Sequence, residues 1–128
     1  MKSIYGKHLI IDGYVRRSST LGPDSLCGLF DTLVQALDMQ YLQRPMAIKV
    51  IPDTRKLDTD EDDGGWSVIC QITTSHIALH GWPLRGAFMM DIFSCKPYDA
   101  DHAIQIVNDY LGVAEKHVRV LERRGPRL

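Results

Sequence analysis

The sequence predicts an α+β fold, a two-layer sandwich in which an antiparallel sheet carries two helices on one face. Three observations support this class. Candidate strands outnumber candidate helices, their order is β-α-β-(long β region)-β-α-β, and the long central region can fold back only as antiparallel hairpins. A chain of 128 residues supports one domain, because two separate cores would each bury too little apolar surface. We therefore expect a single domain over residues 1–128.

The first strand and the first helix follow from hydrophobic patterning. Residues 7–15 (KHLIIDGYV) are apolar and rich in β-branched side chains, which predicts a strand. A Gly-Pro-Asp turn then opens a helix, with Asp24 as its expected cap. Apolar residues recur at helical spacing from Leu26 to Tyr41, and we expect Pro45 to end this helix.

The middle of the chain is predicted to be mostly β. Residues 46–51 alternate well enough to predict a strand, and the acidic, glycine-containing segment 53–65 predicts a loop. Residues 66–80 are rich in β-branched side chains but long for one strand, so they hold two short strands or one bent strand. Residues 87–95 predict a further strand.

A second helix and a last strand complete the order. The tripeptide Pro-Tyr-Asp at 97–99 stops one element and starts the next. Segment 100–111 places its apolar residues on one helical face, and Gly112 closes it. Residues 117–121 (HVRVL) alternate and predict a strand, whereas we expect the polar tail 122–128 to fray.

Composition excludes several classes of protein. Apolar residues make up 45% of the chain and charged residues 24%, which is typical of a globular domain. The net charge of -1 gives no electrostatic basis for binding nucleic acid. No apolar run is long enough to span a membrane or to form a secretory signal. Three cysteines at wide spacing, without a CxxC pair, argue against disulfides and zinc. We therefore expect a cytoplasmic protein without a metal.

The stretch TTSHIALHGWPLRGAFMMDIFSC carries the highest density of reactive side chains. On a strand, His76 and His80 would lie about 13 Å apart, too far to share a metal ion. Cys95 could equally be a small buried side chain, and no GxSxG elbow identifies a serine hydrolase. The residues alone indicate an α+β domain with a reactive strand. Its reactive side chains are Ser75, His76, His80, Asp91 and Cys95.

The same stretch resembles the prokaryotic S-adenosylmethionine decarboxylase family, whose members make a pyruvoyl cofactor by cutting their own chain. That family carries a Glu-Ser junction followed by His and Ile, then His-Thr-Trp-Pro-Glu, then Asp-x-Phe-Thr-Cys. GKHLIIDGY and HVRVLERR resemble the family's first and last strands, so the resemblance spans essentially the whole chain. The matching positions are Ser75, His76, Ile77, His80, Trp82, Pro83, Asp91, Phe93 and Cys95.

The resemblance implies self-processing at Thr74–Ser75. The Ser75 hydroxyl would attack the carbonyl of Thr74, and elimination of the resulting ester would leave a β chain (1–74) and an α chain (75–128) that begins with dehydroalanine. Hydrolysis of this dehydroalanine would give the pyruvoyl group and ammonia. Ser67 and His80 match the residues that assist processing. A substrate amine would form a Schiff base with the pyruvoyl group, which acts as the electron sink for decarboxylation. Cys95 matches the residue that returns a proton to the product carbon.

Substrate binding is expected to involve Trp82, Asp12 and Glu61, and here the chain departs from the family. The family's ribose-binding Glu is replaced by Leu84, the Glu before the scissile bond by Thr74, and the Thr before Trp by Gly81. An acidic run that includes Glu61 stands where the family usually carries an adenine-stacking aromatic residue.

These departures leave three alternatives open. The substrate is S-adenosylmethionine in polyamine (spermidine) biosynthesis, or it is arginine or ornithine, whose distal cation an acidic loop could receive. Alternatively, the chain never cuts itself and acts as a binding or regulatory subunit.

The resemblance also implies a homodimer with active sites at or near the interface. The dimer would act on a small molecule and would bind neither nucleic acid nor a membrane.

Overall fold

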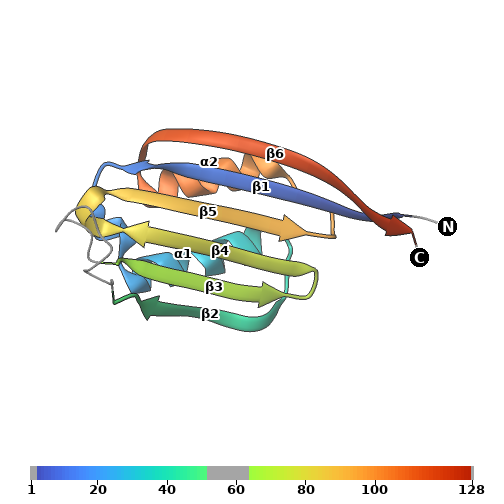
Figure 1. Ribbon diagram of the computed structural model, residues 1–128, viewed down its shortest axis with the longest axis horizontal. Helices are drawn as coiled ribbons and strands as arrows, with labels where there is room; N and C mark the ends of the chain where they lie inside the picture. Colours follow the sequence, from blue (N-terminus) through green and yellow to red (C-terminus); the bar gives the residue numbers. More distant parts are fainter. Residues whose placement is uncertain (1–2, 52–63, 128) are drawn as a thin grey trace.

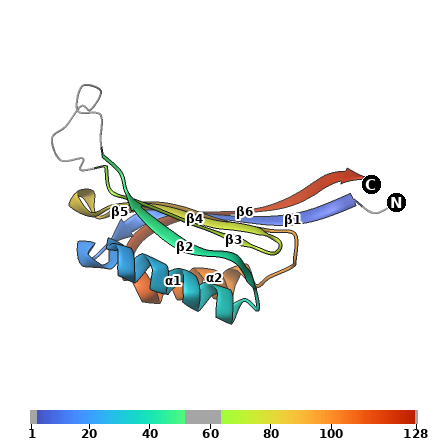
Figure 2. The same ribbon diagram turned by 90° about the horizontal axis from the view of Figure 1, so that it is seen from below.

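The computed structural model describes residues 3–51 and 64–127, which form a six-stranded sheet with two helices on one face (Figures 1 and 2). The strand order is β2-β3-β4-β5-β1-β6, and every neighbouring pair is antiparallel. The predicted fold class and the predicted order of elements are both confirmed. The elements are β1 (Ser3–Val15), α1 (Pro23–Ala36), β2 (Tyr41–Lys49), β3 (Trp66–Ile72), β4 (Ser75–Trp82), β5 (Ala87–Ser94), α2 (Ala100–Leu111) and β6 (Val113–Arg127), with short 3-10 turns at Ser18–Leu21 and Pro83–Arg85.

The core lies between the sheet and the helices. Alternate residues of the central strands point toward the helices, as Leu9 and Ile11 do on β1, and are fully buried. One stripe of each helix meets them, including Phe30 and Leu33 on α1 and Val107 on α2. The intervening residues of each strand therefore point to the other face of the sheet, which no element of the described chain covers (Figure 2).

The Gly-Pro-Asp turn opens the first helix as predicted, but the predicted cap residue and the predicted C-terminal end were wrong. The helix begins at Pro23 with Gly22 as its N-cap, so Asp24 lies in the first turn rather than at the cap. It ends at Ala36, and Asp38 adopts a positive φ of 55° in the turn that follows. The apolar spacing misled because residues beyond the turn continue the pattern by coincidence: Tyr41 already belongs to β2.

Pro45 lies inside β2 rather than ending a helix. A proline removes one donor from a sheet ladder, which an edge strand tolerates better than a central one. The ladder between β2 and β3 is irregular there, with register shifts on both sides of Gln43. β2 is an edge strand of the sheet, and its position explains why the sequence rule failed.

The predicted loop over residues 53–65 lies mostly outside the described residues, and the other predicted elements are present, with a difference at the end of the chain. The long central region forms two strands, β3 and β4, joined by a turn at Thr73–Thr74, and α2 ends at Gly112 as expected. The polar tail does not fray. β6 runs to Arg127, because β1 begins at Ser3 and its ladder pairs with this tail.

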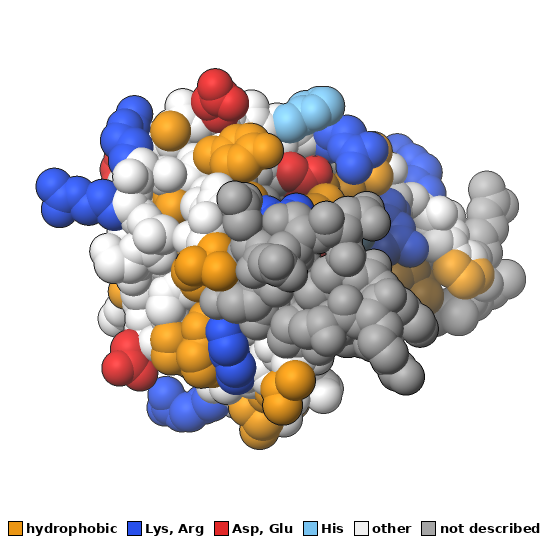
Figure 3. Space-filling view, turned by 60° about the vertical axis from the view of Figure 1, so that its left-hand side comes forward, with side chains coloured by type: hydrophobic (Ala, Val, Ile, Leu, Met, Phe, Trp, Pro, Cys, Tyr) orange, Lys and Arg blue, Asp and Glu red, His pale blue; other side chains and the backbone are white. Residues whose placement is uncertain are grey.

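The uncovered face of the sheet exposes large apolar side chains. Met46, Ile48, Ile69 and Met89 are each about half exposed, at 53%, 55%, 48% and 52%. Figure 3 shows hydrophobic side chains interspersed with lysine, arginine and acidic side chains over one side of the molecule. No helix among the described residues is long and apolar enough to cross a membrane.

Candidate active site

The predicted cleavage junction lies at the turn between β3 and β4. Ser75 opens β4, where it pairs with Ile72 of β3 and with Ser94 of β5. Its backbone has a φ of +152°, a value that residues other than glycine rarely adopt. Such strain persists only where the surrounding structure holds it, and it is concentrated at functional sites. The junction therefore combines a nucleophilic side chain with a strained backbone.

The carbonyl of Thr74 is held by the neighbouring strand. The backbone N–H of Cys95 donates to the Thr74 oxygen at 3.0 Å. The Thr74 hydroxyl lies 2.7 Å from the Ser94 hydroxyl, which also accepts from the backbone N–H of Lys96 at 3.0 Å. A donor placed on a carbonyl oxygen favours the extra negative charge that this oxygen gains when a nucleophile adds. The contact thus fixes and polarises the bond that cleavage would break.

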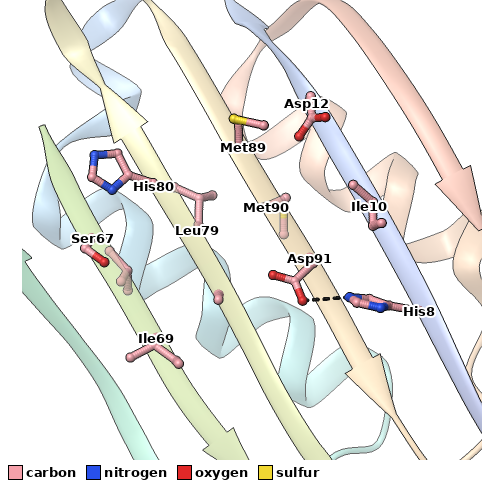
Figure 4. A pocket seen from close by; sticks show the side chains of 12 residues that line it. His8, Ile10, Asp12, Ser67, Ile69, Leu79, His80, Met89, Met90 and Asp91 are labelled. Carbon is pink, nitrogen blue, oxygen red and sulfur yellow. Dashed lines mark hydrogen bonds and ion pairs between the residues drawn. The ribbon is translucent and has the colours of Figure 1, made fainter. Parts of the chain in front are cut away.

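A chain of polar contacts leads from Ser75 across three strands. The Ser75 Oγ lies 3.3 Å from Nδ1 of His76, and Nε2 of His76 lies 2.8 Å from Oδ2 of Asp91. The same carboxylate oxygen lies 2.8 Å from Nε2 of His8. Figure 4 shows the His8–Asp91 contact between β1 and β5. Phe93 packs between the two imidazoles, with ring centroids at 5.4 and 6.0 Å. A hydroxyl, an imidazole and a carboxylate are thus connected in the order that activates a serine.

The same cluster has the ligand types of a metal site. One nitrogen from each of His8 and His76 and one oxygen of Asp91 all lie within 4.8 Å of one another. Two imidazoles and a carboxylate suit zinc or another divalent transition metal. The histidine pair differs from the one considered in the sequence, since His76 meets His8 across the sheet and not His80 along its own strand.

Ser67 and His80 form a second group toward the other end of β4. They are directly opposed in the β3–β4 ladder (Figure 4). Nε2 of His80 donates to the carbonyl of Gly64 at 2.9 Å, and its ring lies 4.2 Å from the ring of Trp82. Gly65 adopts a φ of +64°, and a Cβ there would collide with the carbonyl of Gly81. Glycine at this turn lets its backbone approach β4, beside His80.

An open cleft of about 550 Å³ runs along the uncovered face and is lined by His8 and Asp91 at one end and by Ser67 and His80 at the other. Asp12 lies in the same cross-strand row as His80, since Met89 pairs with both. A second cleft of about 580 Å³ adjoins it and is lined by Asp12, Trp82 and Glu115, among others. Two of the three expected substrate-binding residues therefore line clefts. Glu61, the third, lies outside the described residues, as does the acidic run around it.

The two groups are separated along the strand. His80 lies five positions beyond Ser75, the first residue of β4, which corresponds to about 16 Å in an extended strand. The structure thus brings Thr74, Ser75 and the backbone of Cys95 together, and separately brings Ser67 and His80 together. Within one protomer, the second pair is too far from Ser75 to touch it.

Sequence reasoning missed His8 and did not select His76 and Asp91 as site residues. Period-two alternation places all three on the uncovered face of their strands. Their proximity, however, requires β1 to lie beside β5, and that pairing joins segments about 80 residues apart. The order of strands in a sheet is the signal that the sequence alone did not provide.

Comparison with known proteins gives a consistent result. The family model described as S-adenosylmethionine decarboxylase matches residues 7–124. The crystal structure of the adenosylmethionine decarboxylase from Aquifex aeolicus VF5 superposes with a TM-score of 0.76, over 100% of this chain and 96% of that chain. The two sequences are 20% identical, so this match shows a shared fold and nothing more. An arginine decarboxylase proenzyme from Caldivirga maquilingensis is 40% identical over 52 residues. That match covers 37% of this chain and only 39% of the relative.

The three cysteines are expected to differ sharply in reactivity toward a thiol reagent at pH 8. Cys95 is exposed, whereas Cys70 is buried and burial raises its thiol pKa to about 11. Burial, followed by the charges of Asp31 and Asp24, also raises the pKa of Cys27. At pH 8 a thiol of pKa 11 is ionised in only about one molecule in a thousand. Iodoacetamide should therefore modify Cys95 first, Cys27 later and Cys70 last.

Peptide mapping by mass spectrometry at successive times measures this order. In urea the order should disappear, which serves as the control for intrinsic differences between the peptides. Labelling of Cys70 as fast as Cys95 in the native protein would contradict the described environments.

Proposed function

The chain belongs to the S-adenosylmethionine decarboxylase family, and on that premise we propose that it is a self-cleaving, pyruvoyl-dependent decarboxylase. The observation that carries the proposal is the Thr74–Ser75 junction. A serine with strained backbone follows a carbonyl that accepts a hydrogen bond from Cys95. The word proenzyme in the name of the Caldivirga relative supports the same chemistry.

The residues at the junction fit the formation of the cofactor from the chain itself. Attack by the Ser75 hydroxyl on the Thr74 carbonyl carbon closes a five-membered ring, and rupture of the C–N bond turns the amide into an ester. Loss of the Ser75 Cα proton then expels the Thr74 carboxylate. We propose that His80, assisted by Ser67, removes this Cα proton, because a neutral imidazole accepts protons near neutral pH.

The dehydroalanine that elimination leaves at position 75 would take up water and release ammonia to become a pyruvoyl group, which would supply a carbonyl for the substrate amine and an electron sink for the loss of carbon dioxide. The chain must then return a proton to the product carbon, and we assign that proton to Cys95. Its thiol is exposed, and its backbone N–H lies beside the junction. In this scheme residues 1–128 form one domain, which processing divides into a β chain (1–74) and an α chain (75–128) in the cytoplasm.

Intact mass spectrometry under denaturing conditions tests the proposal. The purified protein should give two fragments, residues 1–74 with a free carboxylate and residues 75–128 blocked by a pyruvoyl group. Ser75→Ala removes the attacking oxygen, so this variant should remain a single chain and lose all activity. Ser25→Ala, which removes a hydroxyl from α1, should be cut like the natural protein.

An uncut natural chain that persists after long incubation would contradict the proposal. It would favour the alternative in which the protein is a non-catalytic binding or regulatory subunit. A cut chain with a serine at the new N-terminus would equally overturn it, since hydrolysis of the peptide bond makes no cofactor.

Two classes of substrate are consistent with this site. The family's description names S-adenosylmethionine. Arginine or ornithine is the second candidate, because Leu84 is 62% exposed and offers no acceptor for a ribose hydroxyl. The carboxylates of Asp12 and Glu115 line the cleft beside Trp82 and could receive a distal guanidinium or ammonium group.

Release of labelled carbon dioxide from S-adenosylmethionine, arginine and ornithine should separate these candidates. Leu84→Glu restores a carboxylate, and a charged hydrogen bond of this kind should lower the KM for S-adenosylmethionine roughly tenfold. Leu84→Gln keeps the length without the charge and is the matched control. No gain with Leu84→Glu would mean that the ribose does not contact position 84.

The 16 Å separation of Ser67 and His80 from Ser75 supports a homodimer. Four large apolar side chains are exposed on the uncovered face: Met46, Ile48, Ile69 and Met89. Burial of such a surface favours association of two chains. Two copies related by a two-fold axis, with facing strands in opposite directions, would set His80 of one protomer over the Ser75 end of its partner. We therefore propose that each active site is completed by a second copy of the chain.

Complementation between inactive variants tests the shared site. Ser75→Ala cannot be cut, and His80→Ala should be cut poorly, roughly a hundredfold slower than the natural chain. Mixed dimers from co-expression should cut the His80→Ala chain, because the partner supplies an intact His80. The double variant Ser75→Ala/His80→Ala should give no rescue. Sedimentation as a monomer at micromolar concentration would contradict the homodimer.

A further inference from the structure

We propose that His76 is the catalytic base of the first reaction of self-cleavage, and that Asp91 and His8 position it. The inference rests on the proposed function, because it assigns residues at the same junction. It differs from the role given to His80, which concerns the later elimination. The contacts that carry it are the chain Ser75–His76–Asp91–His8 and the hydrogen bond on the Thr74 carbonyl.

The carboxylate determines which nitrogen of His76 is free. An ionised carboxylate can only accept hydrogen bonds, so a nitrogen 2.8 Å from its oxygen must carry a proton. Nε2 of His76 is therefore the protonated nitrogen of the neutral ring. Nδ1 is left with its lone pair, and it lies 3.3 Å from Oγ of Ser75. The tautomer imposed by Asp91 is the one that can remove the hydroxyl proton.

His8 contributes through Asp91. Its Nε2 donates to the same oxygen, Oδ2, at 2.8 Å from the opposite strand. Asp91 on β5 thus lies between β1 and β4, and each imidazole is diagonal to it across a strand pair. This second donor restrains the rotation of the carboxylate, so Oδ2 stays directed at His76. His8 and Asp91 are positioning residues, because neither touches the reacting atoms.

His76 alone can move every proton that the conversion of the amide to the ester requires. As Oγ of Ser75 bonds to the Thr74 carbon, its proton moves to Nδ1, and the imidazolium formed is stabilised by Asp91. The Thr74 oxygen becomes negative and keeps its hydrogen bond from the Cys95 N–H. The C–N bond then breaks, the oxygen regains its double bond, and Nδ1 returns the proton to the nitrogen of Ser75. The product is an ester with a free amine, and no outside reactant is consumed.

The position of His76 separates it from His80. The ring of His76 lies at the hydroxyl in the same protomer. His80 of that protomer lies about 16 Å along the strand, so a His80 can reach the junction only from the second copy of the chain. A base for the attack must reach the hydroxyl proton before any rearrangement has occurred. Removal of the Cα proton comes only after the ester has formed. Two histidines thus serve two successive proton transfers.

Hydroxylamine distinguishes these two roles, because it cleaves esters at neutral pH and leaves amides intact. We would follow the full-length chain by mass spectrometry after cell-free synthesis, with and without hydroxylamine. His80→Ala should accumulate the ester, so hydroxylamine should release residues 1–74 and a fragment that begins with intact Ser75. His76→Ala and His76→Gln should accumulate neither ester nor fragments, with cleavage slowed roughly 100-fold or more.

Chemical rescue separates catalysis from folding. Free imidazole should accelerate cleavage of His76→Ala by restoring a base, whereas Asp91→Ala retains the ring and should gain little. His102→Ala removes an exposed imidazole from α2 and should behave like the natural chain. Circular dichroism of each variant checks that it is folded, and His76→Gln retains a polar side chain if His76→Ala does not fold.

Three outcomes would overturn the assignment while leaving the proposed function intact. They are normal cleavage of both His76 variants, accumulation of a hydroxylamine-sensitive ester in them, and cleavage of the natural chain that requires a divalent metal and stops with a chelator. The last would reassign the same three ligand atoms to a metal centre. A natural chain that is never cut would instead remove the proposed function itself.

Discussion

The antiparallel register between β4 and β5 is the constraint on which the site depends. It sets Ser75 opposite Ser94, so the Thr74 carbonyl meets the N–H of Cys95, and it sets Ala78 opposite Asp91, so the carboxylate reaches His76 along the diagonal. Because side chains alternate with a period of two, a slip by one residue would turn the imidazole to the buried face. The register is fixed by burial, since Ile77 and Ile92 pair on the helix side and are fully buried.

The same coupling of core and site extends to β1. Leu9 and Ile11 are buried against the helices, so their neighbours His8 and Ile10 face the cleft on the other side of the sheet. Hydrophobic burial on one face of the sheet thus orients polar groups on the other. The helices leave that second face uncovered, and its clefts are therefore open to a small molecule or to a second copy of the chain (Figure 2).

Local sequence signals predicted most of the fold. Periodicity and turn residues gave the element order, the fold class and α2 with its glycine cap, because those features are set by neighbours in sequence. The predictions for the end of the first helix and for Pro45 were wrong. The helix ends at Ala36 before the turn at Asp38, and Pro45 is tolerated inside β2 because that strand lies at the edge of the sheet. The grouping of His8 with Asp91 was not predicted for a similar reason, since it depends on β1 lying beside β5. Motif spacing predicted a junction at Thr74–Ser75, but it did not reveal that His80 lies far from Ser75 in one protomer.

The location of the junction also explains how the fold could survive its own cleavage. The scissile bond joins the last turn residue, Thr74, to Ser75, the first paired residue of β4, so its rupture would fall at the very end of the ladder between β3 and β4 and leave the pairs from Trp66 onward in place. The two products would also interlock. β1 from the first product lies between β5 and β6 of the second, and β4 of the second pairs with β3 of the first. The fragments could separate only by breaking several ladders and exposing the common core. The proposed cut at this turn would therefore release backbone strain at Ser75 while the sheet keeps the new terminus in place.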